Sequence, residues 1–232
     1  MFCLPAGPQT IIGTTDTWTS EKPETVHAEQ SDIEYLLRSA NAYFPAASLV
    51  PEDVVSAWAG IRPLAAATAA NPGAVSREHS IITDGTGVIH VTGGKLTTYR
   101  AMASEIVDVV QRALGVPVDA ARTDVVELPG ADRRTEILKL QTHDPALAQP
   151  LVPSLPYTAA HLVYAVRREM ARTLSDVLIR RMHLAFETRD HGLGVSAQAA
   201  DIIGPLLGWD EDEKSARIRE FAADVERIFR IG

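Results

Sequence analysis

The sequence predicts an α+β fold in which a mixed first half is followed by an all-α second half. Up to about residue 115, short β-rich runs alternate with segments of helical periodicity. Beyond residue 133 the helical patterns are long and strand signals are almost absent. Apolar residues make up 46% of the chain and charged residues 22%, a balance typical of folded proteins rather than disordered segments. We therefore expect a folded chain with two domains.

The first expected elements are short strands followed by a helix. β-branched residues between Thr10 and Asp16 predict the strands, and turn formers interrupt them at Pro5, Gly7 and Pro8. Ser31, with Glu34 three residues later, predicts a capping box, after which apolar residues recur at helical spacing until Pro45. The sequence thus predicts an amphipathic helix that ends before this proline.

A hairpin and a second helix are expected next. The β-rich runs 81–83 and 88–91 flank Asp84-Gly85-Thr86-Gly87, whose residue types suit positive backbone φ angles. From about Thr97 a helical pattern runs to Gly115, where glycine followed by Pro117 predicts its end. The apolar residues expected to face inward from this helix are Met102, Ile106, Val109, Val110 and Leu114.

The domain boundary is expected in the connecting segment 116–133, which is rich in turn-forming residues. We assign residues 1–115 to a first domain and residues 134–232 to a second, all-α domain.

Capping residues predict the helices of the second domain. Thr158 can cap one helix, Thr173 with Asp176 can cap another, and Ser196 can open a third that ends at Gly208. A last helix follows the acidic run 210–213, which suits the positive end of its dipole. The residues expected on its buried stripe are Ile218, Phe221, Val225 and Ile228.

Charge and cysteine content narrow the partners. With 22 Lys and Arg against 30 Asp and Glu, the formal net charge is -8, and no basic run is long enough to follow a phosphate backbone. Nucleic acid is therefore not expected as a partner. The single cysteine, Cys3, excludes an internal disulfide. No apolar run approaches the roughly 18 to 20 residues that span a bilayer, so we expect a cytoplasmic protein whose membrane contact is at most peripheral.

Two glycine-containing segments have part of a nucleotide-binding motif but lack required residues. Gly85-Thr86-Gly87 begins like a dinucleotide fingerprint, yet His90 stands where close helix packing needs glycine. Gly94-Lys95 has the end of a P-loop, yet Ile89 replaces its first glycine and Leu96 its Ser or Thr. The motifs G-x-S-x-G and H-E-x-x-H are absent, and the seven histidines are scattered. Neither a hydrolase nor a metal centre is indicated.

Cations and glycines in the first half point to an anion site. The cations are Arg62, Arg77 and Lys95, and Gly93-Gly94 directly precedes the lysine. Paired glycines let the backbone approach a ligand, and the helix that follows presents N–H groups and partial positive charge. A reduced flavin gathers negative charge, so such a helix start beside Lys95 would favour flavin reduction. Arg62 and Arg77 are candidates to hold a phosphate dianion, and the alternative for each cation alone is a solvated surface charge.

Several sequence blocks occur in a specific order. Those of the first half are Gly13-Thr14-Thr15-Asp16, W-A-G-I-R-P-L at 58–64, S-R-E-H at 76–79 and G-G-K-L-T-T-Y-R at 93–100. Those of the second half are P-Y-T at 156–158, R-E-M-A at 168–171 and L-S-D-V-L-I-R-R at 174–181. In order and spacing they resemble the C-terminal half of the flavoprotein glycerol-3-phosphate dehydrogenases, over essentially the whole chain.

The resemblance implies an FAD enzyme that oxidises sn-glycerol 3-phosphate to dihydroxyacetone phosphate and passes the electrons to quinone. It implies a homodimer in peripheral contact with the inner face of the cell membrane. For the fold, it implies part of a flavoprotein sheet that binds substrate and FAD, followed by an α-helical cap domain.

Residue by residue, the resemblance places Arg62 beside the substrate near the flavin, Arg77 at the substrate phosphate, and Lys95 at both flavin and substrate. Arg62 and Lys95 are thereby the implied catalytic residues. The residues implied to line the flavin with Lys95 are Gly93, Gly94, Leu96 and Thr97. Cations suit this reaction because they stabilise an alkoxide that develops as hydride leaves. Arginine is not expected to be the base.

Some family features have no counterpart in this sequence. They are the G-x-G-x-x-G strand, turn and helix, an upstream substrate-facing arginine, and a histidine proposed as proton acceptor. We therefore expect this polypeptide alone to be inactive. Two alternatives stay open: a non-catalytic module whose helical domain mediates dimerisation or membrane docking, and a glycerol-3-phosphate oxidase that uses oxygen.

Other polar residues near these blocks have structural interpretations. We interpret Asp16 as a turn-capping aspartate rather than a residue that orients the substrate side. His79 and His90 are expected to be hydrogen-bonded structural histidines rather than proton shuttles. Arg180-Arg181 suits either acidic lipid headgroups or internal ion pairs, and the sequence leaves both open.

Overall fold

The computed structural model of this chain describes residues 1–62 and 78–232. The chain divides into two compact units. The first comprises Met1–Thr15, Glu21–Gly60 and Gly130–Gly232, and the second comprises Asp16–Ser20 and Ile61–Pro129. The predicted domain division at 116–133 stays a prediction. In the structure, residues 1–15 and 21–60 associate with residues 130–232 in the first unit.

The first unit begins with a hairpin. Strands β1 (Phe2–Ala6) and β2 (Gln9–Gly13) pair antiparallel, with Phe2 opposite Gly13 and Ala6 opposite Gln9. Gly7 has a φ of 59° at the turn, as its residue type predicts. Pro5 was expected to interrupt the strand but lies inside β1, opposite Thr10. Proline is tolerated there because, among the described residues, β1 pairs with a strand on one side only.

Helix α1 (Gln30–Tyr43) ends before Pro45 as predicted but begins earlier than expected. The Asp32 carboxylate accepts a hydrogen bond of 3.1 Å from the Glu29 backbone N–H, so this pair takes the place of the predicted Ser31–Glu34 capping box. Several carboxylates of this segment have the spacing of a capping box, and Asp32 rather than Glu34 forms the cap. Ile33 and Ala40 are buried on the inner face of the helix.

The segment after α1 is tied to the helical region of the same unit. The Arg189 guanidinium donates hydrogen bonds of 3.1 and 2.8 Å to the backbone oxygens of Val54 and Glu52. The Trp58 ring meets the Phe186 ring edge to face, with centroids 4.8 Å apart. These contacts explain why residues 21–60 belong with residues 130–232.

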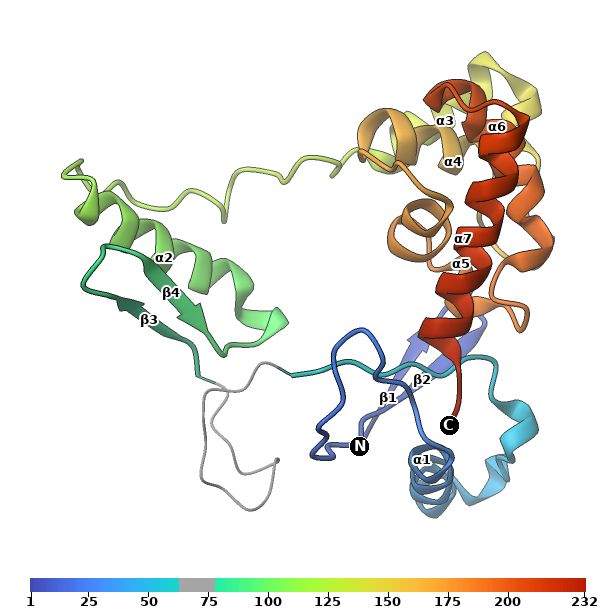
Figure 1. Ribbon diagram of the computed structural model, residues 1–232, viewed down its shortest axis with the longest axis horizontal. Helices are drawn as coiled ribbons and strands as arrows, with labels where there is room; N and C mark the ends of the chain where they lie inside the picture. Colours follow the sequence, from blue (N-terminus) through green and yellow to red (C-terminus); the bar gives the residue numbers. More distant parts are fainter. Residues whose placement is uncertain (63–77) are drawn as a thin grey trace. The chain divides into compact units, whose positions relative to one another are not determined.

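Residues 130–232 form the all-α region that the sequence predicts, and they contain no strand beyond isolated bridges. The helices are α3 (Arg133–His143), α4 (Ala159–Arg168), α5 (Leu184–Glu187), α6 (Ser196–Leu207) and α7 (Glu211–Phe229). Helix α4 packs against α3 and α6, and α6 packs against α7 (Figure 1). With the small two-stranded sheets, this confirms the α+β class. No helix in the described part of the chain is long and apolar enough to cross a membrane.

The main hydrophobic core packs most of these helices together, and a smaller cluster of Ile137, Ala160 and Tyr164 joins α3 to α4. The fully buried large side chains of the main core are Leu162, Leu174, Val177, Leu178, Met182, Leu184, Ile203 and Phe221. Helix α7 buries Phe221 and Val225 as predicted, while Ile218 and Ile228 are half-buried against the same core. Phe229 is also buried, although the sequence pattern did not single it out.

Most of the predicted caps of the second half are present. Thr173 and Asp176 cap reciprocally: the Thr173 backbone N–H donates to the carboxylate at 3.1 Å, and the Asp176 N–H donates to the Thr173 hydroxyl at 3.0 Å. Burial raises the pKa of Asp176, but donors from Arg172 and Thr173 outweigh it, so the pKa lies below its ordinary value. The helix that follows is π-helical over Asp176–Arg181 rather than α-helical. Gly208, with a φ of 76°, ends α6 as expected.

The second unit contains the predicted hairpin. Strands β3 (Ser80–Thr83) and β4 (Ile89–Thr92) pair antiparallel, and Asp84 accepts hydrogen bonds from Thr86 and from the Val88 backbone N–H in the turn. Hydrogen bonds from the side chain of His90 and then Thr86 hold the pKa of Asp84 far below its ordinary value. The segment is a hairpin turn, as the sequence predicts, and not a dinucleotide fingerprint.

Helix α2 (Tyr99–Ala113) follows and ends near Gly115, as predicted. Its burial differs from the prediction. No residue of α2 is fully buried, and Leu114, expected to face inward, is 71% exposed. Helical spacing predicts which residues share a face, but the depth of burial depends on what covers that face.

Leu178→Ala should destabilise the helical region by about 2–5 kcal/mol, because the side chain is fully buried and its loss leaves a cavity. Leu138→Ala is the matched control, since Leu138 lies on α3 and is 53% exposed. We expect it to cost less than about 0.5 kcal/mol. Urea unfolding followed by circular dichroism measures both, and equal losses would contradict the assigned core.

The stability of the helical region should fall as the pH drops below about 6.5. Burial, and then the positive charge of Arg133, lowers the pKa of His161 from 6.5. A lowered histidine pKa means that the unfolded chain binds the proton first, so this stabilisation is present above pH 6.5 and is lost as the pH falls. His161 Nδ1 accepts from the Thr158 N–H at 3.1 Å.

His161→Gln keeps an acceptor for the Thr158 N–H but does not titrate. We expect this variant to flatten the fall in unfolding free energy between about pH 7 and 5, and His143→Gln, at the exposed end of α3, to leave it unchanged. Urea unfolding across this pH range measures the free energy of unfolding at each pH. If both variants give the same slope of this free energy against pH, His161 is not the group responsible.

Candidate functional site

The predicted site residues that the structure describes belong to the second unit. Gly93, Gly94, Lys95, Leu96 and Thr97 lie together in the turn between β4 and α2, which we call the glycine turn (residues 93–98). Arg62 lies elsewhere in the unit, in contact with Asp16. Arg77 lies outside the described residues.

The two glycines of the glycine turn are required by conformation and by space. Gly93 and Gly94 have φ angles of 74° and 89°, in the region that favours glycine. A Cβ atom on Gly93 would overlap the backbone oxygen of Glu78, and one on Gly94 would overlap the side chain of Met102. Only residues without a side chain let the strand, the turn and the helix approach this closely.

A single 3-10 turn joins the glycines to α2. It spans Leu96–Thr98, and both the backbone N–H and the hydroxyl of Thr98 lie 3.0 Å from the Lys95 carbonyl oxygen that accepts them. The side chains from Lys95 to Arg100 are exposed, and Leu96 is 88% exposed. An exposed apolar side chain, an exposed lysine and the positive end of a helix therefore lie within a few residues of one another, which suits contact with a flat ligand that carries negative charge.

Arg62 forms an ion pair with Asp16. Arg62 Nε lies 3.0 Å from Asp16 Oδ1, and the two side chains are 37% and 28% exposed. The interpretation of Asp16 as a turn-capping residue stays a prediction, and the structure adds an ion pair with a predicted site residue. Such a half-exposed pair contributes about 0–1 kcal/mol to stability, so its larger effect is on the direction of the guanidinium.

The two histidines of this unit have carboxylate partners, as expected for structural histidines. His79 Nε2 lies 2.8 Å from Glu105 Oε2 on α2. His90 Nε2 lies 2.8 Å from Asp84 Oδ2 in the hairpin turn. Both rings are thereby oriented by hydrogen bonds within the unit.

The paired arginines of the second half also have partners within the chain. Arg180 Nη1 donates to Asp176 at 2.9 Å, and Arg181 Nε donates to the Glu169 backbone oxygen at 3.0 Å. Of the two interpretations that the sequence left open, the structure favours internal contacts over lipid headgroups.

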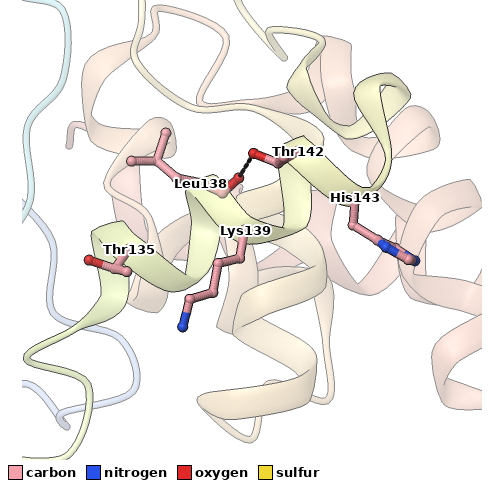
Figure 2. A pocket seen from close by; sticks show the side chains of 5 residues that line it. All are labelled: Thr135, Leu138, Lys139, Thr142 and His143. Carbon is pink, nitrogen blue, oxygen red and sulfur yellow. Dashed lines mark hydrogen bonds between the residues drawn. The ribbon is translucent and has the colours of Figure 1, made fainter.

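Hollows in the first unit contain none of the predicted site residues. One of about 510 Å³ lies along α3, and Figure 2 shows that all five labelled side chains come from that helix. They are Thr135, Leu138, Lys139, Thr142 and His143. A hollow with side chains on a single helix has one wall, and the Thr142 hydroxyl there is bonded to the Leu138 oxygen at 2.8 Å. It does not enclose a ligand.

Among the described residues, Glu21, His27 and Glu29 could together ligate a metal ion, since their ligand atoms lie within 4.8 Å of one another. Arg230 Nη2, however, lies 3.0 Å from His27 Nδ1. A guanidinium at this distance repels a metal cation and already uses one ring nitrogen. The arrangement is an ion cluster within the chain.

Two family models match the chain. Residues 1–109 match the family described as FAD dependent oxidoreductase, and residues 130–214 match the family described as the C-terminal domain of alpha-glycerophosphate oxidase. The glycine turn and Arg62 lie within the first match, and the helical core lies largely within the second.

Named relatives cover nearly the whole chain. Glycerol-3-phosphate dehydrogenase 2 of Mycobacterium tuberculosis is 29% identical over 97% of this chain and 44% of its own length. A glycerol-3-phosphate dehydrogenase of Synechocystis is 30% identical over 97% of this chain and 47% of its own length. The solved structure of the Bacillus halodurans glycerol-3-phosphate dehydrogenase, complexed with FAD, has a TM-score of 0.72 at 25% identity and covers 97% of this chain. This chain spans about half the length of these relatives.

Gly93→Ala should destabilise the second unit more than Gly87→Ala. Both glycines have positive φ, but only the Gly93 substitution meets backbone, since nothing lies within 4 Å of a Cβ on Gly87. We expect about 1–2 kcal/mol for Gly87→Ala from backbone strain, and at least about 1 kcal/mol more for Gly93→Ala from the collision.

Gly85→Ala is the control without either penalty, because Gly85 has open space and no positive φ. Hydrogen exchange of the β3 and β4 amides measures the opening of this unit alone. Equal protection in the Gly93 and Gly87 variants would contradict the close approach of the glycine turn to Glu78.

Proposed function

We propose that this chain, which belongs to the family of FAD-dependent glycerol-3-phosphate dehydrogenases, supplies the substrate-side wall and the helical cap of an enzyme that oxidises sn-glycerol 3-phosphate to dihydroxyacetone phosphate. The glycine turn carries the proposal. It lies within the match to FAD dependent oxidoreductases, and its paired glycines directly precede an exposed lysine and the start of α2.

The residues of the glycine turn fit FAD. Gly93 and Gly94 have no side chain and are packed closely against Glu78 and Met102, and exposed Leu96 offers an apolar contact to a flat ring. FAD, when bound, would supply the hydride acceptor for oxidation of the substrate at C2. Lys95 and the α2 N-terminus place positive charge where the reduced ring would gather negative charge. Thr97 completes the proposed wall.

Three cations serve the substrate in this proposal. Arg62 lies beside the substrate near the flavin, Arg77 binds the phosphate, and Lys95 contacts both substrate and flavin. Positive charge stabilises the C2 alkoxide that develops as the hydroxyl proton leaves. The base is a group other than these arginines, because a guanidinium does not readily lose its proton.

The remainder of the proposed active site comes from outside these residues. The sequence holds no G-x-G-x-x-G strand, turn and helix, and the relatives are about twice as long. We propose that the activity requires a segment that supplies the dinucleotide-binding part, and that the boundary between wall and cap lies at 116–133. The ends of the two family matches, at residues 109 and 130, support that boundary.

The electron acceptor in this proposal is quinone, with the enzyme a homodimer in the cytoplasm at the inner face of the cell membrane. A relative in Staphylococcus saprophyticus is named aerobic glycerol-3-phosphate dehydrogenase, which supports a respiratory acceptor. Oxygen itself is the second candidate, favoured by the match of residues 130–214 to a domain of alpha-glycerophosphate oxidase. Comparing rates of reoxidation by a quinone analogue and by oxygen in the FAD-loaded enzyme distinguishes the two.

The chain expressed with its upstream coding sequence should bind one FAD and reduce a dye when given sn-glycerol 3-phosphate. The 232 residues alone should do neither to the same extent, since only one wall of the site is present. Flavin absorbance and dye reduction measure these outcomes. Catalysis that is absent although FAD binds would refute the assigned substrate and would favour the alternative of a non-catalytic docking or dimerisation module.

In that enzyme, Lys95→Ala should lower kcat/KM for sn-glycerol 3-phosphate by about 10- to 100-fold, as expected for the loss of one charge-assisted contact. Lys22→Ala, an exposed lysine of the first unit, should leave kcat/KM within about twofold. Steady-state kinetics measures kcat/KM for both variants. An unchanged kcat/KM in Lys95→Ala would show that the glycine turn is not part of the site.

A further inference from the structure

Two side chains enclose Gly94 in the glycine turn. A Cβ placed on Gly94 would overlap Met102 and would lie 3.4 Å from the Cβ of His79. Met102 belongs to α2, and His79 lies immediately before β3. The turn is therefore gripped between the start of the hairpin and the helix that follows it.

A hydrogen bond also joins the start of the hairpin to α2. His79 Nε2 meets Glu105 Oε2 at 2.8 Å, between residues 26 apart in the sequence. Glu105 lies three residues after Met102, so both project from neighbouring positions on one side of α2. Figure 1 shows α2 running beside the β3–β4 hairpin, and the His79–Glu105 bond joins the two.

The other histidine of the hairpin offers an internal comparison. His90 meets Asp84 at the same distance of 2.8 Å, but the two residues are only six apart and the contact stays within the hairpin and its turn. It leaves the glycine turn untouched. The two histidines thus make similar bonds with different consequences: one stabilises a local turn, and the other links α2 to the start of β3.

We propose that His79 and Glu105 are positioning residues of the enzyme: their bond fixes the glycine turn so that Lys95 and the start of α2 hold the direction that substrate and flavin require. This inference rests on the proposed function, because only that function gives the direction of Lys95 a role. Neither residue is proposed to touch the reacting atoms. Their action passes through Gly94 and Met102 to the backbone of the turn.

The geometry predicts which substitutions preserve the function. His79→Gln keeps a side-chain amide that can donate to Glu105, whereas His79→Ala removes the contact. Glu105→Ala removes the same contact from the other side. Because the two residues act as one unit, the double alanine variant should be little worse than either single variant.

Trypsin cleavage after Lys95 in the 232-residue chain tests whether the His79–Glu105 bond holds the glycine turn in place. The peptides are quantified by mass spectrometry. A partly exposed pair is worth enough to change the open population by about threefold. His79→Ala should therefore raise the cleavage rate about threefold, His79→Gln should restore it, and His90→Ala should leave it unchanged. Equal rates in His79→Ala and His90→Ala would overturn the inference.

In the FAD-loaded enzyme the same variants separate positioning from folding. His79→Ala should raise KM for sn-glycerol 3-phosphate at least threefold, with rescue by His79→Gln and no change in His90→Ala. Faster cleavage with unchanged kinetics would make the pair structural only and overturn the inference. An FAD-loaded wild-type protein that does not oxidise sn-glycerol 3-phosphate would instead refute the proposed function, and the pair would then have no positioning role in that reaction.

Discussion

The close passage of the Gly93 backbone past the Glu78 carbonyl is the constraint on which the candidate site depends. No side-chain carbon fits between them, so the chain must turn there through a glycine with positive φ. A second glycine then lets Met102 approach, and α2 begins one 3-10 turn later. The exposed positions of Lys95 and Leu96 follow from this path. The binding role proposed for them therefore depends on backbone geometry before it depends on side-chain chemistry.

Stability and candidate chemistry are divided between different parts of the molecule. The deeply buried side chains are concentrated in the helical region, whereas α2 buries none of its residues fully. Sites that bind large ligands must leave surface uncovered, and this costs the packing that would otherwise stabilise them. The second unit therefore relies on glycine geometry and on polar contacts such as His79–Glu105. Such contacts are worth less than core packing but fix direction more sharply.

The sequence predicts local features such as helix caps better than it predicts contacts between residues far apart in the chain. The caps at Thr158 and at Thr173 with Asp176, and the glycine that ends α6, depend on residues within one helical turn, and the structure contains them. The start of α1 was misplaced because neighbouring carboxylates compete for the same cap. Asp16 and Glu105 were missed as partners for a different reason. Each pairs with a residue far along the chain, and no spacing rule connects them.

Asp16 also bears on the proposed role of Arg62. In the proposed function Arg62 lies beside an anionic substrate, and Asp16 next to Arg62 reduces the positive charge there. The loss is tolerable when direction limits catalysis more than affinity does, because misplacing a reacting group by about 1 Å can cost about 100-fold in rate. An arginine held at Nε by a carboxylate presents a fixed planar fork rather than a mobile charge. The pairing therefore fits the proposal that Arg62 orients the substrate and does not merely attract it.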